Sequence, residues 1–159
     1  MASPYYISRT GPDHNSGLIT SPWKTVHKGL DALTTAGDIL YIKAGTYTEV
    51  DVLSAIGLIA ANSGTAAAPI IIEGYSVTPG DGLSGVILDC ATETLEHGFA
   101  ISPVSAPQSY YIIRNIEVKN ALHIGFSTSS AQAVSNVIFE NCIASDCVIG
   151  FKIDDTQNL

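Results

Sequence analysis

Apolar and polar residues alternate in three short segments of the second half of the chain, and the segments resemble one another. Residues 85–90, 110–116 and 136–142 align so that Asp89, Asn115 and Asn141 fall 26 residues apart. A Gly-Phe pair follows each segment, at 98–99, 125–126 and 150–151. The Asn or Asp position and the Gly-Phe pair recur at nearly constant spacing in all three copies. They predict three regular repeats of about 26 residues across 85–159.

The apolar residues change from odd to even positions, or the reverse, at the repeated Asn or Asp. Tyr111, Ile113 and Asn115 share one strand face, but Ile116 and Val118 continue the apolar positions with the opposite parity. Because strand side chains alternate with a period of two, the reversal predicts a corner. Asn tolerates the left-handed backbone conformation that a tight corner needs.

A third short strand is expected to begin at each Gly-Phe pair. Three short strands per repeat are typical of a β-solenoid coil. Stacked coils would place Asp89, Asn115 and Asn141 in a structural ladder of about 4.8 Å per step. Cys90, Ile116 and Cys142 would then stack beside this ladder. A β-sandwich with coincidental spacing is the alternative.

The first part of the chain predicts an end cap. Ser21 and Pro22 favour a helix start, and the apolar spacing predicts one amphipathic helix over 22–35. Its apolar face is expected to cover the end of the core. The cap-packing residues are Trp23, Val26, Leu30 and Leu33.

The chain is expected to form a single domain, 1–159, in three parts. Residues 1–37 hold a strand at 5–8, a loop and the capping helix, and residues 38–84 form the first irregular coils, including strands at 38–42 and 70–73. Between these strands, residues 49–68 predict an inserted loop or short helix. The regular repeats occupy 85–159.

Charge and cysteine content exclude several classes of protein. Fifteen acidic residues against seven basic ones give a net charge of −8, which disfavours a nucleic-acid partner or an anionic membrane surface. The longest apolar run, 52–61, is too short to span a bilayer, so no membrane insertion is expected. The three cysteines, at odd count and without zinc-site spacing, are expected to be free thiols. They are Cys90, Cys142 and Cys147.

Four stretches resemble the N-terminal region of right-handed parallel β-helix proteins. They are Tyr6–Gly17, Pro22–Thr25, the run Gly-Asp-Ile-Leu-Tyr-Ile-Lys-Ala-Gly-Thr-Tyr at 37–47, and Pro-Ile-Ile-Ile-Glu-Gly-Tyr at 69–75. This superfamily includes pectate-lyase-like polysaccharide lyases and phage tail or tailspike proteins. The resemblance implies an all-β fold, a right-handed parallel β-helix with one N-terminal capping α-helix. The same fold serves enzymes and non-enzymes, so it leaves the activity open.

The resemblance to the lyases implies calcium held by clustered acidic residues and a Lys or Arg base. No catalytic residue can be assigned from the sequence, and no cofactor is expected, with Ca²⁺ as the alternative. The acidic residues that could be considered for a metal are Asp146, Asp154 and Asp155. Other candidates are Glu93, Glu96 and His97 on a loop, the cations Arg114, Lys119 and Lys152, and Tyr110 and Tyr111 for stacking on sugars. Asp89 is interpreted as a structural corner residue, and Tyr111 is in phase with the core.

Two functions remain open from the sequence. The first is a structural, carbohydrate-recognising component of a phage virion or a cell surface. The alternative is the N-terminal part of a secreted polysaccharide lyase or glycosidase that acts on an acidic polysaccharide. The expected partners are a polysaccharide or surface glycan, together with copies of the chain in a trimer or other assembly proteins. No signal peptide is visible after Met1, and the expected location is the virion or the extracellular space.

The last predicted strand ends near Leu159 without a closing cap. Such an end would expose a coil edge and part of the core. We therefore expect a longer β-helix, a trimer, or docking on another protein.

Overall fold

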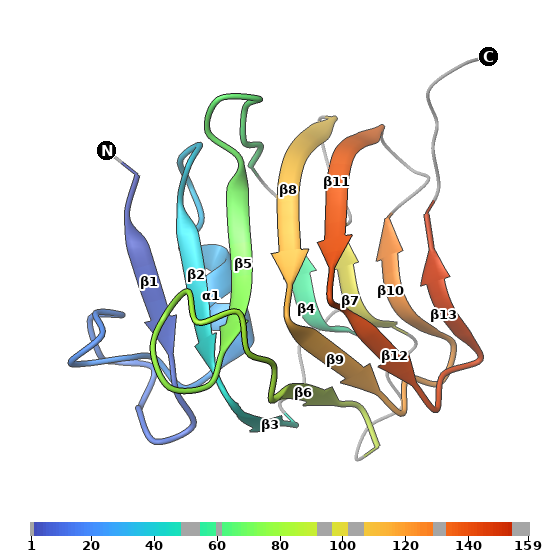
Figure 1. Ribbon diagram of the computed structural model, residues 1–159, viewed down its shortest axis with the longest axis horizontal. Coiled ribbons are helices and arrows are strands. Elements are labelled where there is room, and N and C mark those ends of the chain that lie inside the picture. The colour runs from blue at the N-terminus through green and yellow to red at the C-terminus, as the bar shows by residue number, and fades with distance from the viewer. Residues whose placement is uncertain are drawn as a thin grey trace.

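Three parallel β-sheets make up most of the structure, a computed structural model (Figure 1). It describes residues 2–48, 62–91, 97–101, 107–128 and 133–153, and the backbone of 55–59. Within these residues every pair of neighbouring strands in a sheet is parallel. The predicted all-β fold with parallel strands is confirmed.

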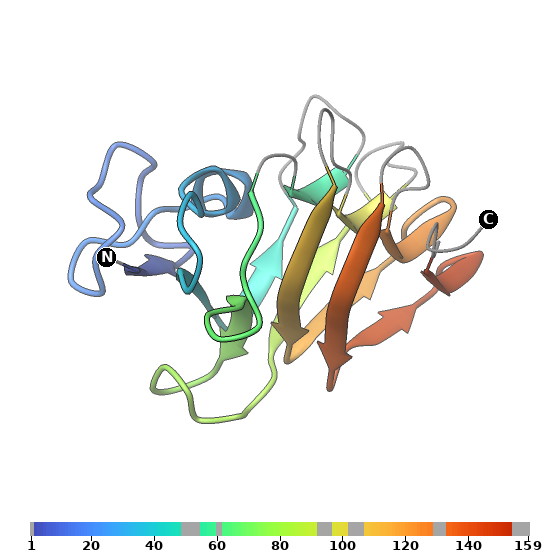
Figure 2. The same ribbon diagram turned by 90° about the horizontal axis from the view of Figure 1, so that it is seen from above.

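From β2 onward the chain passes through the three sheets in a repeating order, one strand in each. The five-stranded sheet has the order β1 (Pro4–Ile7), β2 (Ile39–Lys43), β5 (Ile70–Tyr75), β8 (Gln108–Arg114) and β11 (Val134–Glu140). One four-stranded sheet contains β3 (Gly45–Tyr47), β6 (Val86–Asp89), β9 (Ile116–Lys119) and β12 (Ile143–Ser145). The other contains β4 (Ala55–Ile59), β7 (His97–Ile101), β10 (Ile124–Thr128) and β13 (Ile149–Lys152). Figure 2 shows the strands of successive turns side by side.

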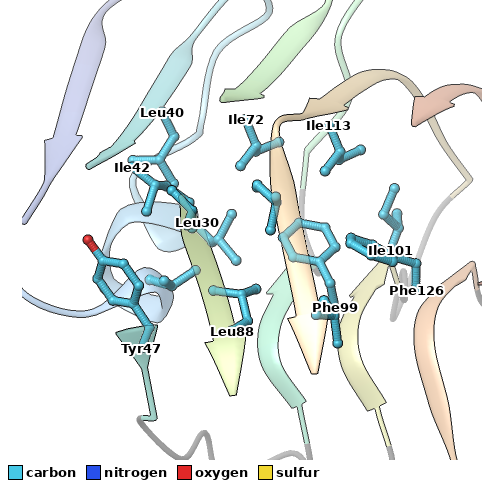
Figure 3. Packing of buried hydrophobic residues seen from close by; sticks show 14 of the residues in the cluster. Leu30, Leu40, Ile42, Tyr47, Ile72, Leu88, Phe99, Ile101, Ile113 and Phe126 are labelled. Carbon is cyan, nitrogen blue, oxygen red and sulfur yellow. The ribbon is translucent and has the colours of Figure 1, made fainter. Parts of the chain in front are cut away.

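The inner faces of the sheets meet in one apolar core (Figure 3). The Gly-Phe pairs lie in register, since Phe126 pairs with Phe99 on one side and with Phe151 on the other. The ring centroids of Phe126 and Phe151 are 4.9 Å apart in a stacked arrangement. A Cβ on Gly98 would lie 2.0 Å from Val118 Cγ1, so the glycine permits close packing between the sheets.

Asn115 and Asn141 occupy equivalent corners between the five-stranded sheet and the sheet of β9 and β12. Their φ angles are 59° and 50°, in the left-handed region. The Nδ2 of Asn141 donates to Oδ1 of Asn115 over 3.3 Å, which links the two corners. The position below Asn115 is Gly74, because Glu73 pairs with Arg114.

Asp89 does not belong to this ladder, contrary to the sequence prediction. It pairs with Lys119 in the four-stranded sheet, one strand further along the turn. Gly74 occupies the place in the ladder that the sequence predicted for Asp89. Only glycine fits there, since a Cβ on Gly74 would lie 2.1 Å from the Asn115 carbonyl oxygen. Cys90 is shifted in the same way: its N–H donates to the Lys119 carbonyl, so it does not stack with Ile116.

The helix is shorter than predicted and begins later. Helix α1 spans Val26–Asp31 with Thr25 as its N-cap, whereas 22–35 with Ser21 as the cap was expected. Trp23 is extended because its N–H donates to the Tyr6 carbonyl and its carbonyl accepts from the Ser8 N–H. Because the segment around Trp23 pairs with β1, the helix begins only at Val26.

The predicted cap-packing residues are all buried. Trp23 is 7% exposed, Val26 is fully buried, and Leu30 and Leu33 are 4% and 3% exposed. Gly29 brings the helix against β1 and β2, since a Cβ there would lie 2.6 Å from Ile7 Cδ1. Helix α1 thus lies at the N-terminal end of the core (Figure 2).

Two further predictions concern the first turns and the thiols. Residues 55–59 form strand β4, so the expected loop or helix over 49–68 is wrong there, and 49–54 and 60–61 lie outside the described residues. All three cysteines are free, and burial raises the pKa of Cys90 to about 12 and that of Cys142 to about 11.

No helix among the described residues has the length and apolar character needed to cross a membrane.

Candidate functional site

One row of side chains crosses the outer face of the five-stranded sheet. The strand register aligns Tyr6 with Tyr41, Tyr41 with Glu73, Glu73 with Arg114, and Arg114 with Glu140. These positions alternate with core residues along their strands, so they lie on the face away from the core. We call these five residues the outer row.

The N-terminal half of the outer row is aromatic. The rings of Tyr6 and Tyr41 are stacked with centroids 5.4 Å apart, and Tyr75 meets Tyr41 edge-on at 6.2 Å. Burial raises the pKa of Tyr41, and the negative charge of Glu73 raises it further. Burial also raises the pKa of Tyr75. The hydroxyl groups of Tyr41 and Tyr75 are therefore neutral near pH 7, on rings that are half-buried for Tyr41 and 6% exposed for Tyr75.

The other half of the outer row is a charged cluster. The Nη2 of Arg114 lies 2.6 Å from Oε2 of Glu73, whose side chain is only 2% exposed. The Nη1 of Arg114 lies 3.8 Å from Oε2 of Glu140, which is 54% exposed. The Nε of Arg114 is buried and has no hydrogen-bond partner among the residues that the structure describes. Glu73 thus fixes a guanidinium group that keeps donor capacity toward the surface.

The loop 76–85 lies between two hollows on this face. The first, of about 150 Å³, lies over the charged cluster and is lined by Glu73, Gly80, Gly82, Arg114, Asn115, Glu140 and Asn141. The second, of about 320 Å³, is lined by Ser8, Thr10, Ile19, Pro22, Lys43, Tyr75, Val77 and Pro79. Together with the tyrosines they give an extended, mixed polar and aromatic surface.

Asp81 holds this loop in shape. Its Oδ2 accepts from the N–H groups of Val77 at 2.7 Å, Ser76 at 3.1 Å and Thr78 at 3.2 Å. Its Oδ1 accepts from the Leu83 N–H at 3.0 Å. These hydrogen bonds, that of Val77 above all, hold the pKa of Asp81 below its usual value.

Of the three acidic residues predicted for a metal, the structure describes Asp146 alone. Asp146 has a left-handed φ of 52° at the corner after β12. The described residues contain no group of three or more His, Cys, Asp or Glu placed to hold a metal ion. Asp154 and Asp155 lie outside the described residues, as do Glu93 and Glu96.

The remaining candidates are dispersed. Asp89 accepts from Asn120 Nδ2 at 2.8 Å, and this hydrogen bond is the main cause of its lowered pKa. His97 begins β7, and its Nδ1 lies 3.3 Å from Ser127 Oγ. Lys119 and Lys152 lie in the two four-stranded sheets.

Of the two tyrosines proposed for sugar stacking, Tyr111 is fully buried and Tyr110 is half-buried with a φ of 62°. The hydroxyl of Tyr111 donates to Gln108 Oε1 at 3.2 Å. Tyr111 is therefore a core residue. The prediction that Tyr111 points into the core is confirmed.

Of the outer row, sequence reasoning found Arg114 but missed the other four residues, Tyr6, Tyr41, Glu73 and Glu140. A usable signal exists, because Ile70–Glu73 aligns with the segments ending at Arg114 and Glu140. That alignment alone would have placed the three charged residues in one row.

Comparison with curated proteins finds a similarity to one pectate lyase. The chain is 29% identical over 104 residues to pectate lyase PEL9 of Emericella nidulans, which covers 62% of this chain and 24% of that protein. No protein-family model matches the chain. The chain therefore spans about a quarter of the length of this curated relative.

Solved structures show the same fold. A rhamnogalacturonan lyase superposes with a TM-score of 0.60 at 20% identity, covering 86% of this chain and 36% of that one. The GH136 lacto-N-biosidase from Eubacterium ramulus gives a TM-score of 0.50 at 14% identity, covering 91% and 31%. At these identities the likeness concerns the fold alone. With the pectate lyase match, it confirms the predicted relationship to the pectate-lyase-like superfamily.

Proposed function

We propose that the three parallel sheets are the faces of a right-handed parallel β-helix with α1 at its N-terminal end. The order of the strands supports this, because β5–β6–β7, β8–β9–β10 and β11–β12–β13 each visit the three sheets once. Parallel crossover connections are right-handed in about 98% of cases.

We further propose that the chain is part of a carbohydrate-active protein of the polysaccharide lyase or glycosidase type. Of the two functions left open by the sequence, the matched lyases and glycosidase favour this one over a virion component. The proposed role of the described residues is to bind a polysaccharide along the outer face of the five-stranded sheet.

The outer row is the observation that carries this proposal. Stacked tyrosines offer ring faces to sugar rings, and their hydroxyls offer hydrogen bonds. Arg114, held by Glu73, offers a fixed guanidinium to a carboxylate. An acidic polysaccharide would meet both groups along one line across the strands.

Arg114 acts here as a binding group. A guanidinium stays protonated in proteins, and the ion pair with Glu73 holds this one in place. We therefore assign to Arg114 the positioning of an anionic sugar and assign no bond-breaking step to it.

The test is binding of polygalacturonate and its methyl-esterified form, measured by isothermal titration calorimetry. We expect Tyr41→Ala to weaken polygalacturonate binding by up to about tenfold, the scale of one aromatic contact. Arg114→Gln should weaken polygalacturonate binding about fivefold and leave the ester unaffected, since an exposed ion pair contributes up to about 1 kcal/mol.

Two matched variants control for general effects. Lys119→Gln removes the same charge from another sheet, and Phe151→Ala removes a half-exposed aromatic ring elsewhere. Both should bind like the wild type. A folded wild-type chain that binds no glycan, or equal losses in Lys119→Gln and Arg114→Gln, would overturn the proposal.

A further inference from the structure

A third hollow, of different character, lies at the N-terminal end of the molecule. It has a volume of about 200 Å³ and is lined by Arg9, Lys24, Thr25, Tyr47 and Thr48. None of these residues belongs to the outer row. Among the residues that the structure describes, the lining holds two cations and no carboxylate.

Strand β3 fixes the position of Arg9. The guanidinium donates to the carbonyl oxygen of Thr46. Its aliphatic stem crosses Gly45, where a Cβ would lie 3.2 Å from Arg9 Cδ. The head group is thus directed along the β3 side of the hollow rather than free in solvent.

Asp13 fixes the opposite side. Its Oδ1 accepts from the N–H groups of Lys24 and Thr25, each at 2.9 Å, and its Oδ2 accepts from Thr25 Oγ1 at 2.9 Å. Both carboxylate oxygens are therefore engaged by the segment that carries Lys24. The Asp13 carboxylate positions this segment and does not itself line the hollow.

The local charge is unlike that of the whole chain. The net charge is −8, yet four of the seven Lys and Arg residues lie within residues 9–43. The other acidic groups of this region are engaged elsewhere. Asp38 accepts from the N–H groups of Ser3, Thr34 and Thr35, and Asp31 lies 3.4 Å from His27.

We propose that this hollow is a binding site for a single anionic group, a carboxylate or sulfate carried by a saccharide or present as a free ion. Arg9 offers its remaining guanidinium donors, Lys24 offers an ammonium group, and the exposed Thr48 offers a hydroxyl. The volume suits one such group with a few waters, since a water occupies about 30 Å³. The site does not depend on glycan binding at the outer row.

The experiment is a ¹H–¹⁵N NMR titration at low salt with three probes, trigalacturonate, its methyl ester and sodium sulfate. We expect trigalacturonate to shift the amides of Thr25, Tyr47 and Thr48, and the methyl ester to leave them in place. If sulfate shifts the same amides, a free anion suffices. If only trigalacturonate does so, the anion must be carried by a sugar, and either result supports the site.

Variants give the size of the effect. Lys24→Gln should weaken trigalacturonate binding at these amides about threefold to fivefold, as expected for a partly exposed ion pair. Arg9→Gln should also weaken trigalacturonate binding. Lys119→Gln, in a different sheet, is the charge-matched control and should leave the titration unchanged.

Thermal unfolding of each variant separates binding from folding, because Arg9 also holds the Thr46 carbonyl. Within the described part of the chain the Lys24 ammonium makes no hydrogen bond, so Lys24→Gln keeps the measurement informative if Arg9→Gln is unstable. Equal shifts with the methyl ester, an unchanged titration in Lys24→Gln, or the same loss in Lys119→Gln would overturn the proposal. Shifts confined to the outer row would overturn the anion site and leave the proposed function standing.

Discussion

Replacing Arg114 by Met tests the charged cluster directly. The change leaves Glu73, whose side chain is 2% exposed, without its ion-pair partner at 2.6 Å. Breaking a fully buried pair costs about 3–5 kcal/mol. Arg114 is itself 34% exposed, so solvent screening lowers our expectation to about 2 kcal/mol of unfolding free energy.

Glu140 provides the internal comparison. It lies 3.8 Å from Arg114 and is 54% exposed, so Glu140→Gln should cost less than about 1 kcal/mol. The double variant Glu73→Met with Arg114→Met should return to within about 1 kcal/mol of the wild type. It removes both charges and leaves none buried alone.

Chemical denaturation at pH 7, followed by circular dichroism, gives the four free energies. A loss of 2 kcal/mol corresponds to a decrease of roughly 4–8 °C in Tm for a chain of this size. The reasoning is refuted if Glu140→Gln costs as much as Arg114→Met. It is also refuted if the double variant loses at least as much as Arg114→Met alone.

Three further predictions concern the core and the loop beside the charged cluster. Gly98→Ala should cost about 1–2 kcal/mol in denaturation experiments because its Cβ would lie 2.0 Å from Val118 Cγ1. The cost should be smaller in a Val118→Ala background, where the Gly125 carbonyl oxygen at 3.0 Å still limits the space. Phe126→Ala, at a fully buried ring, should cost about 3–5 kcal/mol, and Phe151→Ala, at a 43% exposed ring, less than half as much. The lowered pKa of Asp81 means that its stabilisation of the loop is present above the ordinary pKa of about 3.9 and is lost as the pH falls through the lower folded value. The Val77 amide should therefore titrate below pH 3.8 by NMR, and Asp81→Asn at pH 7 should reproduce the low-pH spectrum.

The sequence predicted the repeat well where local pattern and spacing agree. The Gly-Phe pairs lie in register, and Asn115 and Asn141 have the left-handed backbone expected at a corner. Both features follow from steric demands of single residues, which a sequence displays directly.

The errors arise where pairing between distant strands overrides the local pattern. Asp89 was aligned with Asn115 because both follow an apolar strand, yet the loop 76–85 lengthens that turn and makes Gly74 the equivalent position. Ser21 and Pro22 favour a helix start, but the hydrogen bonds of Trp23 to β1 keep this segment extended. Neither the loop length nor this pairing could be derived from local propensity.

The site was only partly predictable for the same reason. Arg114 stood out as a cation on an outward face, but its partner Glu73 is 41 residues earlier. Their contact depends on the register of β5 against β8, which the repeat alignment had not included. Glu73 is also almost fully buried, which only the packed sheet and loop can produce.

The stacked arrangement has a consequence for how the protein opens. The inner positions Tyr111 and Ile113 of β8 are fully buried, whereas the equivalent Val137 and Phe139 of β11 are only partly buried. Each strand pairs only with its neighbours in a sheet, so local unfolding can begin at the edge strands and proceed inward. We expect amide hydrogen exchange to be fastest in β11–β13 and progressively slower toward β5 and β2. Such a gradient would make the protein a set of coupled units with graded stability rather than one all-or-none block.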